Sequence, residues 1–70
     1  MNNNVIHSIN GPVVTVRNTS DFSMMEMVYV GNAGLIGEVI TINESKTTIQ
    51  VYENTTGLYI GEPVVGSGAP

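Results

Sequence analysis

Short apolar runs alternate with polar turn residues along this chain, and this alternation limits its possible folds more than any other feature. The runs are rich in Val, Ile, Thr and Tyr, and clusters of Gly, Asn and Ser separate them at intervals of about ten residues. These residue types favour strands and tight turns, and no window has the pattern of a long helix. The sequence therefore predicts an all-β fold with six strands, near residues 5–9, 13–17, 27–30, 36–42, 47–53 and 63–65.

The two strands predicted at 36–42 and 47–53 give the most definite hairpin. The polar segment 43–46 between them has the composition of a short hairpin loop and would pair the strands antiparallel. In the second strand, Ile49 and Val51 oppose polar neighbours. In the first strand, the even-numbered positions share one face and hold three isoleucines and one glutamate: Ile36, Glu38, Ile40 and Ile42. We expect each strand to have one buried and one exposed face.

Two sites predict the irregularities that curl a small sheet. Gly11-Pro12 interrupts the first apolar stretch, and proline cannot donate to a ladder, so we expect a bulge or bend there. Gly37 lies inside a strand pattern, where a missing side chain indicates a bulge or another backbone passing close by. A small sheet closed on itself hides its edges. The prediction is therefore a small, closed, antiparallel β-barrel of six strands with Greek-key-like connections.

The remaining segments predict the ends of the domain and one loop. Met24 to Met27 would hold one helical turn, capped by Ser20 or Asp21. Residues 1–4 are expected to be a flexible N-terminus, residues 5–66 the barrel, and residues 67–70, rich in Gly and Ser, a linker towards an absent nucleotide-binding domain.

Composition excludes several classes of function. The chain has 70 residues, which suffices for one small core, and it has no cysteine for a disulfide or a thiolate zinc site. Two basic residues against six acidic ones give a net charge of −4, which disfavours nucleic acid. No run approaches the roughly 20 apolar residues of a membrane span, and Met1 to Asn4 lacks a basic signal region. We expect a cytoplasmic domain without direct membrane insertion.

Residues that could perform chemistry are few. Lys46 is the only lysine and has no preceding glycine loop to cradle phosphate, while Gly31, Gly34 and Gly37 precede a strand instead of a helix. His7 is a single histidine without a ligand set. Three methionine thioethers could bind Cu(I) but more commonly fill apolar gaps: Met24, Met25 and Met27. Three carboxylates could suggest acid-base chemistry, but we interpret them as part of a solvated face: Glu38, Glu53 and Glu62. The sequence predicts no catalytic, cofactor or metal residue.

Three segments in the second half of the chain carry a resemblance: Gly34-Leu-Ile-Gly-Glu-Val-Ile40, Ile49 to Leu58, and Gly61-Glu-Pro-Val64. Together with Gly11-Pro12-Val-Val14 and Met27-Val-Tyr-Val-Gly31, they closely resemble the N-terminal β-barrel domain of the catalytic A subunits of V-type and archaeal-type rotary ATPases. The non-catalytic B subunits usually carry Phe and Gly at the positions of Tyr52 and Asn54. The family-motif positions are Gly11, Pro12, Gly34, Gly37, Glu38, Gln50, Tyr52, Glu53, Gly57, Gly61, Glu62 and Pro63.

The resemblance implies an assembly role. In that family, six barrels alternate between A and B subunits and form a crown on the soluble head, which is peripheral to the membrane. The parent couples ATP hydrolysis or synthesis to proton or sodium transport and binds Mg-ATP outside this segment. Its partners would be the neighbouring A and B subunits, and the isolated domain would be monomeric. The coupling ion, the direction of the reaction and the interface residues stay open.

A second hypothesis is a separate binding module, an SH3-like or oligonucleotide-binding barrel for a peptide or another partner. One Phe, three Tyr and no Trp offer few stacking surfaces, and the acidic balance opposes nucleic acid. A small enzyme would need a convergent polar cluster, which the sequence does not indicate. A phosphate-binding loop downstream in the gene would decide for the ATPase.

Overall fold

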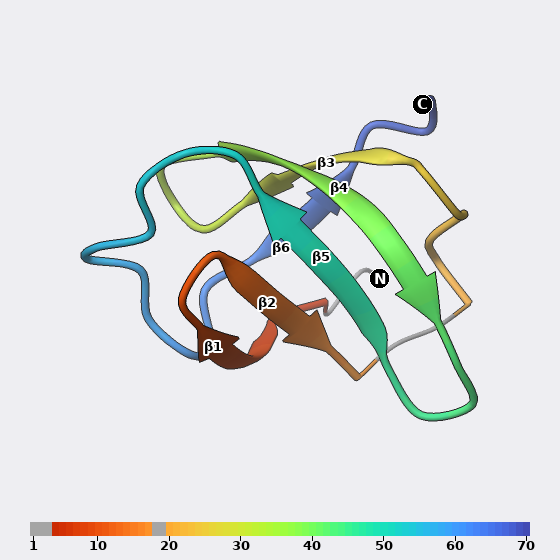
Figure 1. Ribbon diagram of the computed structural model, residues 1–70, viewed down its shortest axis with the longest axis horizontal. Helices are drawn as coiled ribbons and strands as arrows, with labels where there is room; N and C mark the ends of the chain where they lie inside the picture. The colour runs from red at the N-terminus through yellow and green to blue at the C-terminus, as the bar shows by residue number, and fades with distance from the viewer. Residues whose placement is uncertain (1–3, 18–19) are drawn as a thin grey trace.

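A computed structural model describes residues 4–17 and 20–70. The six strands are β1 (Ile6–Asn10), β2 (Val13–Val16), β3 (Met27–Val30), β4 (Leu35–Ile42), β5 (Thr47–Val51) and β6 (Val64–Gly66). They form one sheet in the order β1-β2-β5-β4-β3-β6, and every neighbouring pair is antiparallel (Figure 1). The prediction of an all-β fold with six strands is confirmed, and each strand end lies within about two residues of its expected position.

The connectivity is that of a Greek key. A long connection leads from β2 to β3, and the meander of β3, β4 and β5 then brings β5 back beside β2. The sheet curls so that its two edge strands, β1 and β6, approach each other across the molecule (Figure 1).

Closure of the curl is partial, so the expectation of a closed barrel was slightly overstated. Within residues 4–17 and 20–70, the edges meet at one isolated antiparallel bridge, between Val5 and Pro63. Three backbone hydrogen bonds accompany it: Ile6 N to Glu62 O at 2.9 Å, Gly61 N to Ile6 O at 2.9 Å, and Val64 N to Asn4 O at 3.0 Å. We call these residues, 4–6 and 61–64, the seam. The fold is a curled half-barrel that the seam joins at one place.

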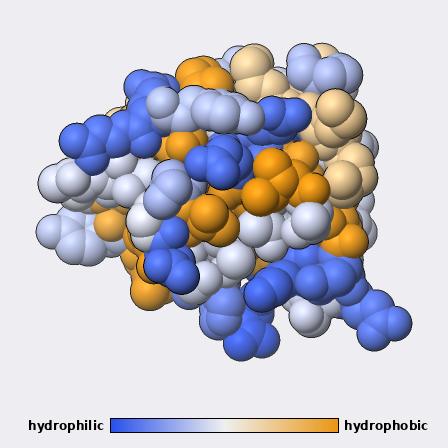
Figure 2. Space-filling model, viewed as in Figure 1, coloured by the Kyte–Doolittle hydropathy of each residue, from blue (hydrophilic) through white to orange (hydrophobic). Residues whose placement is uncertain are grey.

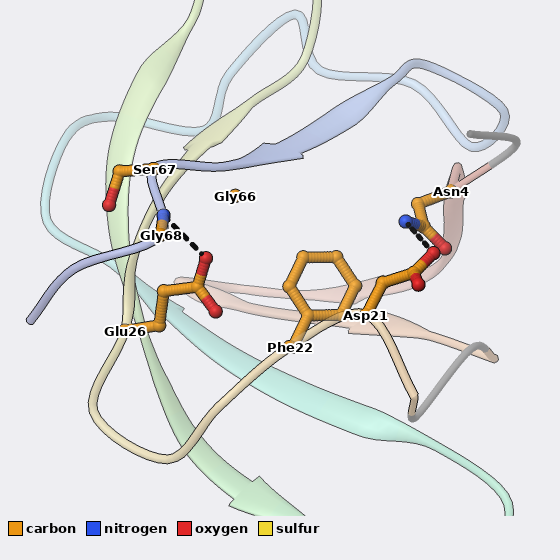
Figure 3. Close-up of a pocket in the computed structure, with 7 residues that line it drawn as sticks. All are labelled: Asn4, Asp21, Phe22, Glu26, Gly66, Ser67 and Gly68. Atoms are coloured by element: carbon orange, nitrogen blue, oxygen red, sulfur yellow. Dashed lines mark hydrogen bonds between the residues drawn. The ribbon is translucent and has the colours of Figure 1, made fainter. Parts of the chain in front are cut away.

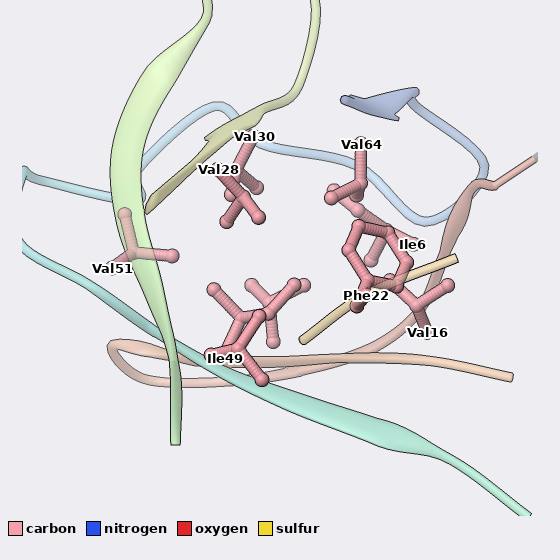
Figure 4. Packing of buried hydrophobic residues seen from close by; sticks show 10 residues of the cluster. Ile6, Val16, Phe22, Val28, Val30, Ile49, Val51 and Val64 are labelled. Atoms are coloured by element: carbon pink, nitrogen blue, oxygen red, sulfur yellow. The ribbon is translucent and has the colours of Figure 1, made fainter. Parts of the chain in front are cut away.

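The core fills the inside of this curl (Figure 4). Branched side chains dominate it, because they fit closely between facing pleated strands. Phe22 comes from the connection between β2 and β3 and packs beside Ile6 and Val16 (Figure 4). The buried members are Ile6, Val14, Val16, Phe22, Val28, Val30, Val39, Ile49, Val51 and Val64.

The faces of β4 differ from a simple alternation. Gly37 and Val39 are the buried residues, so the isoleucine parity does not face the core along the whole strand. The register shifts between Val39 and Thr41, which leaves Ile40 as the extra residue of a bulge, 39% exposed. After the bulge the parity reverses, and Ile42 packs against the core. One inserted residue therefore exchanges the faces within a single strand.

The turns around the sheet follow their local chemistry. The loop at 43–46 is confirmed as the β4–β5 hairpin, and Asn43 Oδ1 accepts hydrogen bonds from the amides of Ser45 and Lys46, both at 3.0 Å. Gly11 and Pro12 form a tight two-residue turn between β1 and β2, with Gly11 at φ 59°. This turn is the bend expected at the pair, and β1 has a separate bulge at His7, where the register shifts between Ile6 and Ser8.

The predicted helical turn at Met24 to Met27 is wrong. Ser23 to Glu26 form a tight turn in which the Glu26 amide donates to Ser23 O at 3.1 Å, and Met25 has a positive φ of 66°. A positive φ at the third position of such a turn does not continue into a helix.

Candidate functional site

The family-motif glycines mark turns in different parts of the molecule. Gly11, Gly34, Gly57 and Gly61 have positive φ values of 59°, 68°, 90° and 95°, a region that side chains other than glycine rarely adopt. Gly37 acts differently, because a Cβ there would lie 2.8 Å from Ile49 Cγ2 and 3.0 Å from Gln50 O. The glycines therefore shape several turns and do not gather at one site.

Glu62 ties two loops together with its carboxylate. Oε1 accepts from the amide of Asn32 at 2.8 Å, in the β3–β4 turn, and Oε2 accepts from the amide of Tyr59 at 2.9 Å, in the β5–β6 connection. Gly31 leaves room for this arrangement, since a Cβ there would lie 2.8 Å from Glu62 Oε1. Charge-assisted bonds to backbone amides are among the stronger hydrogen bonds in proteins. Glu62 thus has a structural role in this fold.

The other two predicted carboxylates also bond within the chain. Glu53 Oε2 accepts from the amide of Ile36 at 2.6 Å. The Tyr52 hydroxyl donates to Glu38 Oε1 at 2.5 Å. This hydrogen bond, the partial desolvation of the hydroxyl and the nearby Glu38 charge raise the pKa of Tyr52 above its ordinary value of 10.0. Glu38, Glu53 and Glu62 therefore hold loops and a side chain in place by hydrogen bonds, and they do not form a freely solvated face.

Glu26 is a carboxylate that sequence reasoning did not single out. Its side chain is 6% exposed, Oε1 accepts from the Ser23 amide at 2.8 Å, and Oε2 accepts from the Gly68 amide at 2.9 Å (Figure 3). Gly66 leaves room for it, because a Cβ there would collide with Oε2. The spacing Ser-x-x-Glu is a signal that could have indicated the Ser23 contact, since the same spacing forms reciprocal caps at helix starts.

Residues 67–69, expected to be part of a linker, are hydrogen-bonded to the start of β3. Ser67 N donates to Met27 O at 3.0 Å, and Met27 N donates to Ala69 O at 2.8 Å. Together with the Glu26 bond to Gly68, these contacts hold the segment against the sheet.

A polar hollow of about 490 Å³ lies between this segment and the connection from β2 to β3 (Figure 3). Asn4 Nδ2 donates to Asp21 Oδ2 at 3.1 Å on one side, and Glu26 lies on the other. Within residues 4–17 and 20–70, no group of three His, Asp or Glu side chains is placed to hold a metal ion. The hollow therefore offers polar surface without a built ligand set.

The remaining candidates are dispersed. His7 Nδ1 accepts from Arg17 Nε at 3.2 Å on the exposed side of β1 and β2. Met24 and Met25 are exposed, whereas Met27 is half-buried in β3. Gly31 and Gly34 form the β3–β4 turn, in which Gly34 N donates to Gly31 O at 3.0 Å, and the chain then continues as a strand, as predicted. In the described part of the chain, no helix is long and apolar enough to cross a membrane.

The model of one protein family, described as the ATP synthase alpha/beta family, beta-barrel domain, matches residues 6–68. The chain belongs to this family. The matched segment contains all six strands, so the curled sheet is the beta-barrel domain of the ATP synthase alpha/beta family.

Similar members of the ATP synthase alpha/beta family are catalytic subunits. The chain is 49% identical over its full length to the catalytic A subunit of the V-type proton ATPase of Cyanidium caldarium. It is 51% identical to the corresponding protein of Candida albicans over 93% of the chain, and 56% identical to the A subunit of the A-type ATP synthase of Haloferax volcanii over 94%. The chain spans only 12%, 10% and 11% of the length of these relatives.

One solved structure shows the same fold at low identity. The assembled ATPase EscN from the type III secretion system of enteropathogenic E. coli superposes with a TM-score of 0.82. The match covers 93% of this chain and 16% of EscN at 22% sequence identity. This likeness supports the barrel fold alone.

Proposed function

We propose that this chain is the N-terminal barrel domain of a catalytic A subunit in a V-type or A-type rotary ATPase, and that it joins neighbouring A and B subunits into the crown of the soluble head. The observation that carries the proposal is the identity of 49% to 56% with A subunits over 93% to 100% of the chain. Tyr52 adds to it, because the family's B subunits usually have Phe there.

The chemistry of the described residues supports a structural role. Glu26, Glu53 and Glu62 accept hydrogen bonds from backbone amides, and Glu38 accepts one from Tyr52. The sequence contains no phosphate-cradling glycine loop followed by lysine. ATP hydrolysis or synthesis, Mg-ATP binding and ion transport would therefore belong to other parts of the parent complex. The soluble head, with this domain, would lie at the cytoplasmic face of the membrane.

A domain exchange tests the assembly role. The barrel of the Haloferax volcanii relative, 56% identical over 66 residues, would be replaced by this chain. We expect the chimera to assemble with the B subunits of that enzyme, which native mass spectrometry measures, and to hydrolyse ATP. A matched control carries the EscN barrel, which has the same fold at 22% identity. Failure of the first chimera to assemble, or equal assembly of the control, would contradict a role specific to A subunits.

The division of labour gives a direct prediction for the 70-residue chain. Titration with Mg-ATP in a calorimeter should give no heat of specific binding, because the described turns present no amide cradle at a helix start and the chain has only two basic residues. A dissociation constant for Mg-ATP in the micromolar range would contradict the prediction. An unfolded sample is excluded by recording the circular dichroism of the same solution.

A further inference from the structure

An apolar groove lies on the outer face of the sheet, separate from the core. It has a volume of about 290 Å³, and its lining includes Met25, Met27, Ile36, Glu38, Tyr52 and Pro70. Gly37 adds backbone without a side chain. Apolar atoms gather on this side of the molecule, near the end of the connection between β2 and β3 (Figure 2). Met25 and Tyr52 are 62% and 61% exposed, so this surface is open to a partner.

Among the described residues that line the groove, Glu38 is the one with a charged side chain. It pairs with Met27 across β3 and β4, and Oε1 accepts the Tyr52 hydroxyl at 2.5 Å. Among the described residues, Oε2 has no hydrogen-bond partner. The two basic side chains of the chain lie elsewhere: Arg17 bonds to His7 beside β2, and Lys46 belongs to the β4–β5 hairpin. The carboxylate is therefore not neutralised from within the described chain.

We propose that this groove binds a protein segment that presents an arginine beside an apolar side chain. The charge of Glu38 and the net charge of −4 favour a cationic occupant. The exposed Tyr52 ring lies next to the carboxylate, so one guanidinium can bond to Glu38 and stack on the ring. Met25 and Met27 supply flexible thioethers that adapt to an apolar neighbour.

The charge of Glu38 and the apolar surface together determine which ligand the groove prefers. A free cation gains little at a half-exposed carboxylate, and an uncharged apolar segment leaves the carboxylate desolvated without a partner. A segment with both features satisfies both parts of the groove. This inference goes beyond the assembly role and does not depend on it.

Two blocked tripeptides test the proposal on the whole chain: acetyl-Leu-Arg-Ile-amide and acetyl-Leu-Gln-Ile-amide. Titrations are followed by nuclear magnetic resonance of backbone amides and methionine methyl groups. We expect the arginine peptide to give saturable shifts at Met25, Met27 and Gly37 with a dissociation constant of about 1 mM. The glutamine peptide should bind at least about fivefold more weakly.

Two variants with the same loss of charge separate the local contact from the general field. Glu38→Gln should weaken binding of the arginine peptide at least about fivefold, whereas Glu44→Gln, at an exposed position in the β4–β5 hairpin, should leave it unchanged. Tyr52→Phe keeps the aromatic ring and should weaken binding of the arginine peptide less than Glu38→Gln does.

Four results would overturn the proposal. They are equal binding of the two peptides, equal effects of the two glutamate variants, no saturable shift up to about 10 mM peptide, and shifts of the groove signals with protein concentration alone. The last result would mean that a second copy occupies the groove. Failure here leaves the domain exchange described above unaffected.

Discussion

Gly37 shows how one missing side chain allows two strands to pack. A Cβ at this position would lie 2.8 Å from Ile49 Cγ2 and 3.4 Å from Val30 Cγ2, inside the core. We expect Gly37→Val to lower the free energy of unfolding by about 1 to 3 kcal/mol, although valine favours strands. Chemical denaturation measures the change. Thr41→Val is the control, since it introduces valine at an exposed position of β4 without adding volume and should change stability by less than about 0.5 kcal/mol.

Tyr52 gives a prediction about pH. Its hydroxyl donates to Glu38, which raises its pKa above the ordinary value of 10.0. The hydrogen bond therefore contributes to stability below pH 10.0 and is lost as the pH rises through the raised pKa. In a spectroscopic titration of tyrosinate, Glu38→Gln should return one of the three tyrosines towards its ordinary pKa. Tyr52→Phe identifies that tyrosine, and an unchanged titration curve in Glu38→Gln would refute the assignment.

The sequence singled out most of the structurally important glutamates but not the hydrogen bonds that they make. The sequence drew attention to Glu38, Glu53 and Glu62, but it did not reveal that their oxygens bond within the fold, because most of the donors come from distant segments. The amide of Tyr59, which donates to Glu62, is the local exception. Glu26 was missed for the same reason: its bond to Gly68 spans 42 residues. A single sequence reports the local spacing of Ser23 and Glu26 and nothing of the second contact.

Strands and hairpins, at the scale of the element, were predictable because the information is local. Runs of branched residues and polar turn residues placed all six strands. The bulge at Ile40 was not predictable, since no Gly or Pro marks it and the register is decided by pairing with β5. The turn at Met24 and Met25 was missed because methionine favours helices, whereas here the connection must bring Phe22 into the core.

The bulge in β4 can be tested with two matched truncations. Val39 is fully buried and Ile40 is 39% exposed. A simple alternation would instead place Ile40 on the same face as Ile36 and Ile42, which is the more apolar face of the strand. We expect Val39→Ala to cost about 2 kcal/mol of unfolding free energy and Ile40→Ala less than about 1 kcal/mol. Equal costs, measured by urea denaturation, would contradict the assigned register.

The whole molecule is expected to be a monomer at micromolar concentration. Its net charge of −4 repels identical copies. The proposed crown alternates two kinds of protein, so each side of this barrel would match a different partner. Sedimentation equilibrium should give a mass near 7.4 kDa. A stable trimer or hexamer would show that such barrels associate without the B partner.

The seam has a consequence for how the chain can be connected. Val64 N donates to Asn4 O at 3.0 Å, so the first and last parts of the sheet are neighbours in space although about 60 residues separate them along the chain. A circularly permuted chain, with a short glycine bridge between these parts and new ends in the exposed 43–46 hairpin, would keep every strand pairing. The sheet then depends on which strands lie side by side and not on which of them is synthesised first.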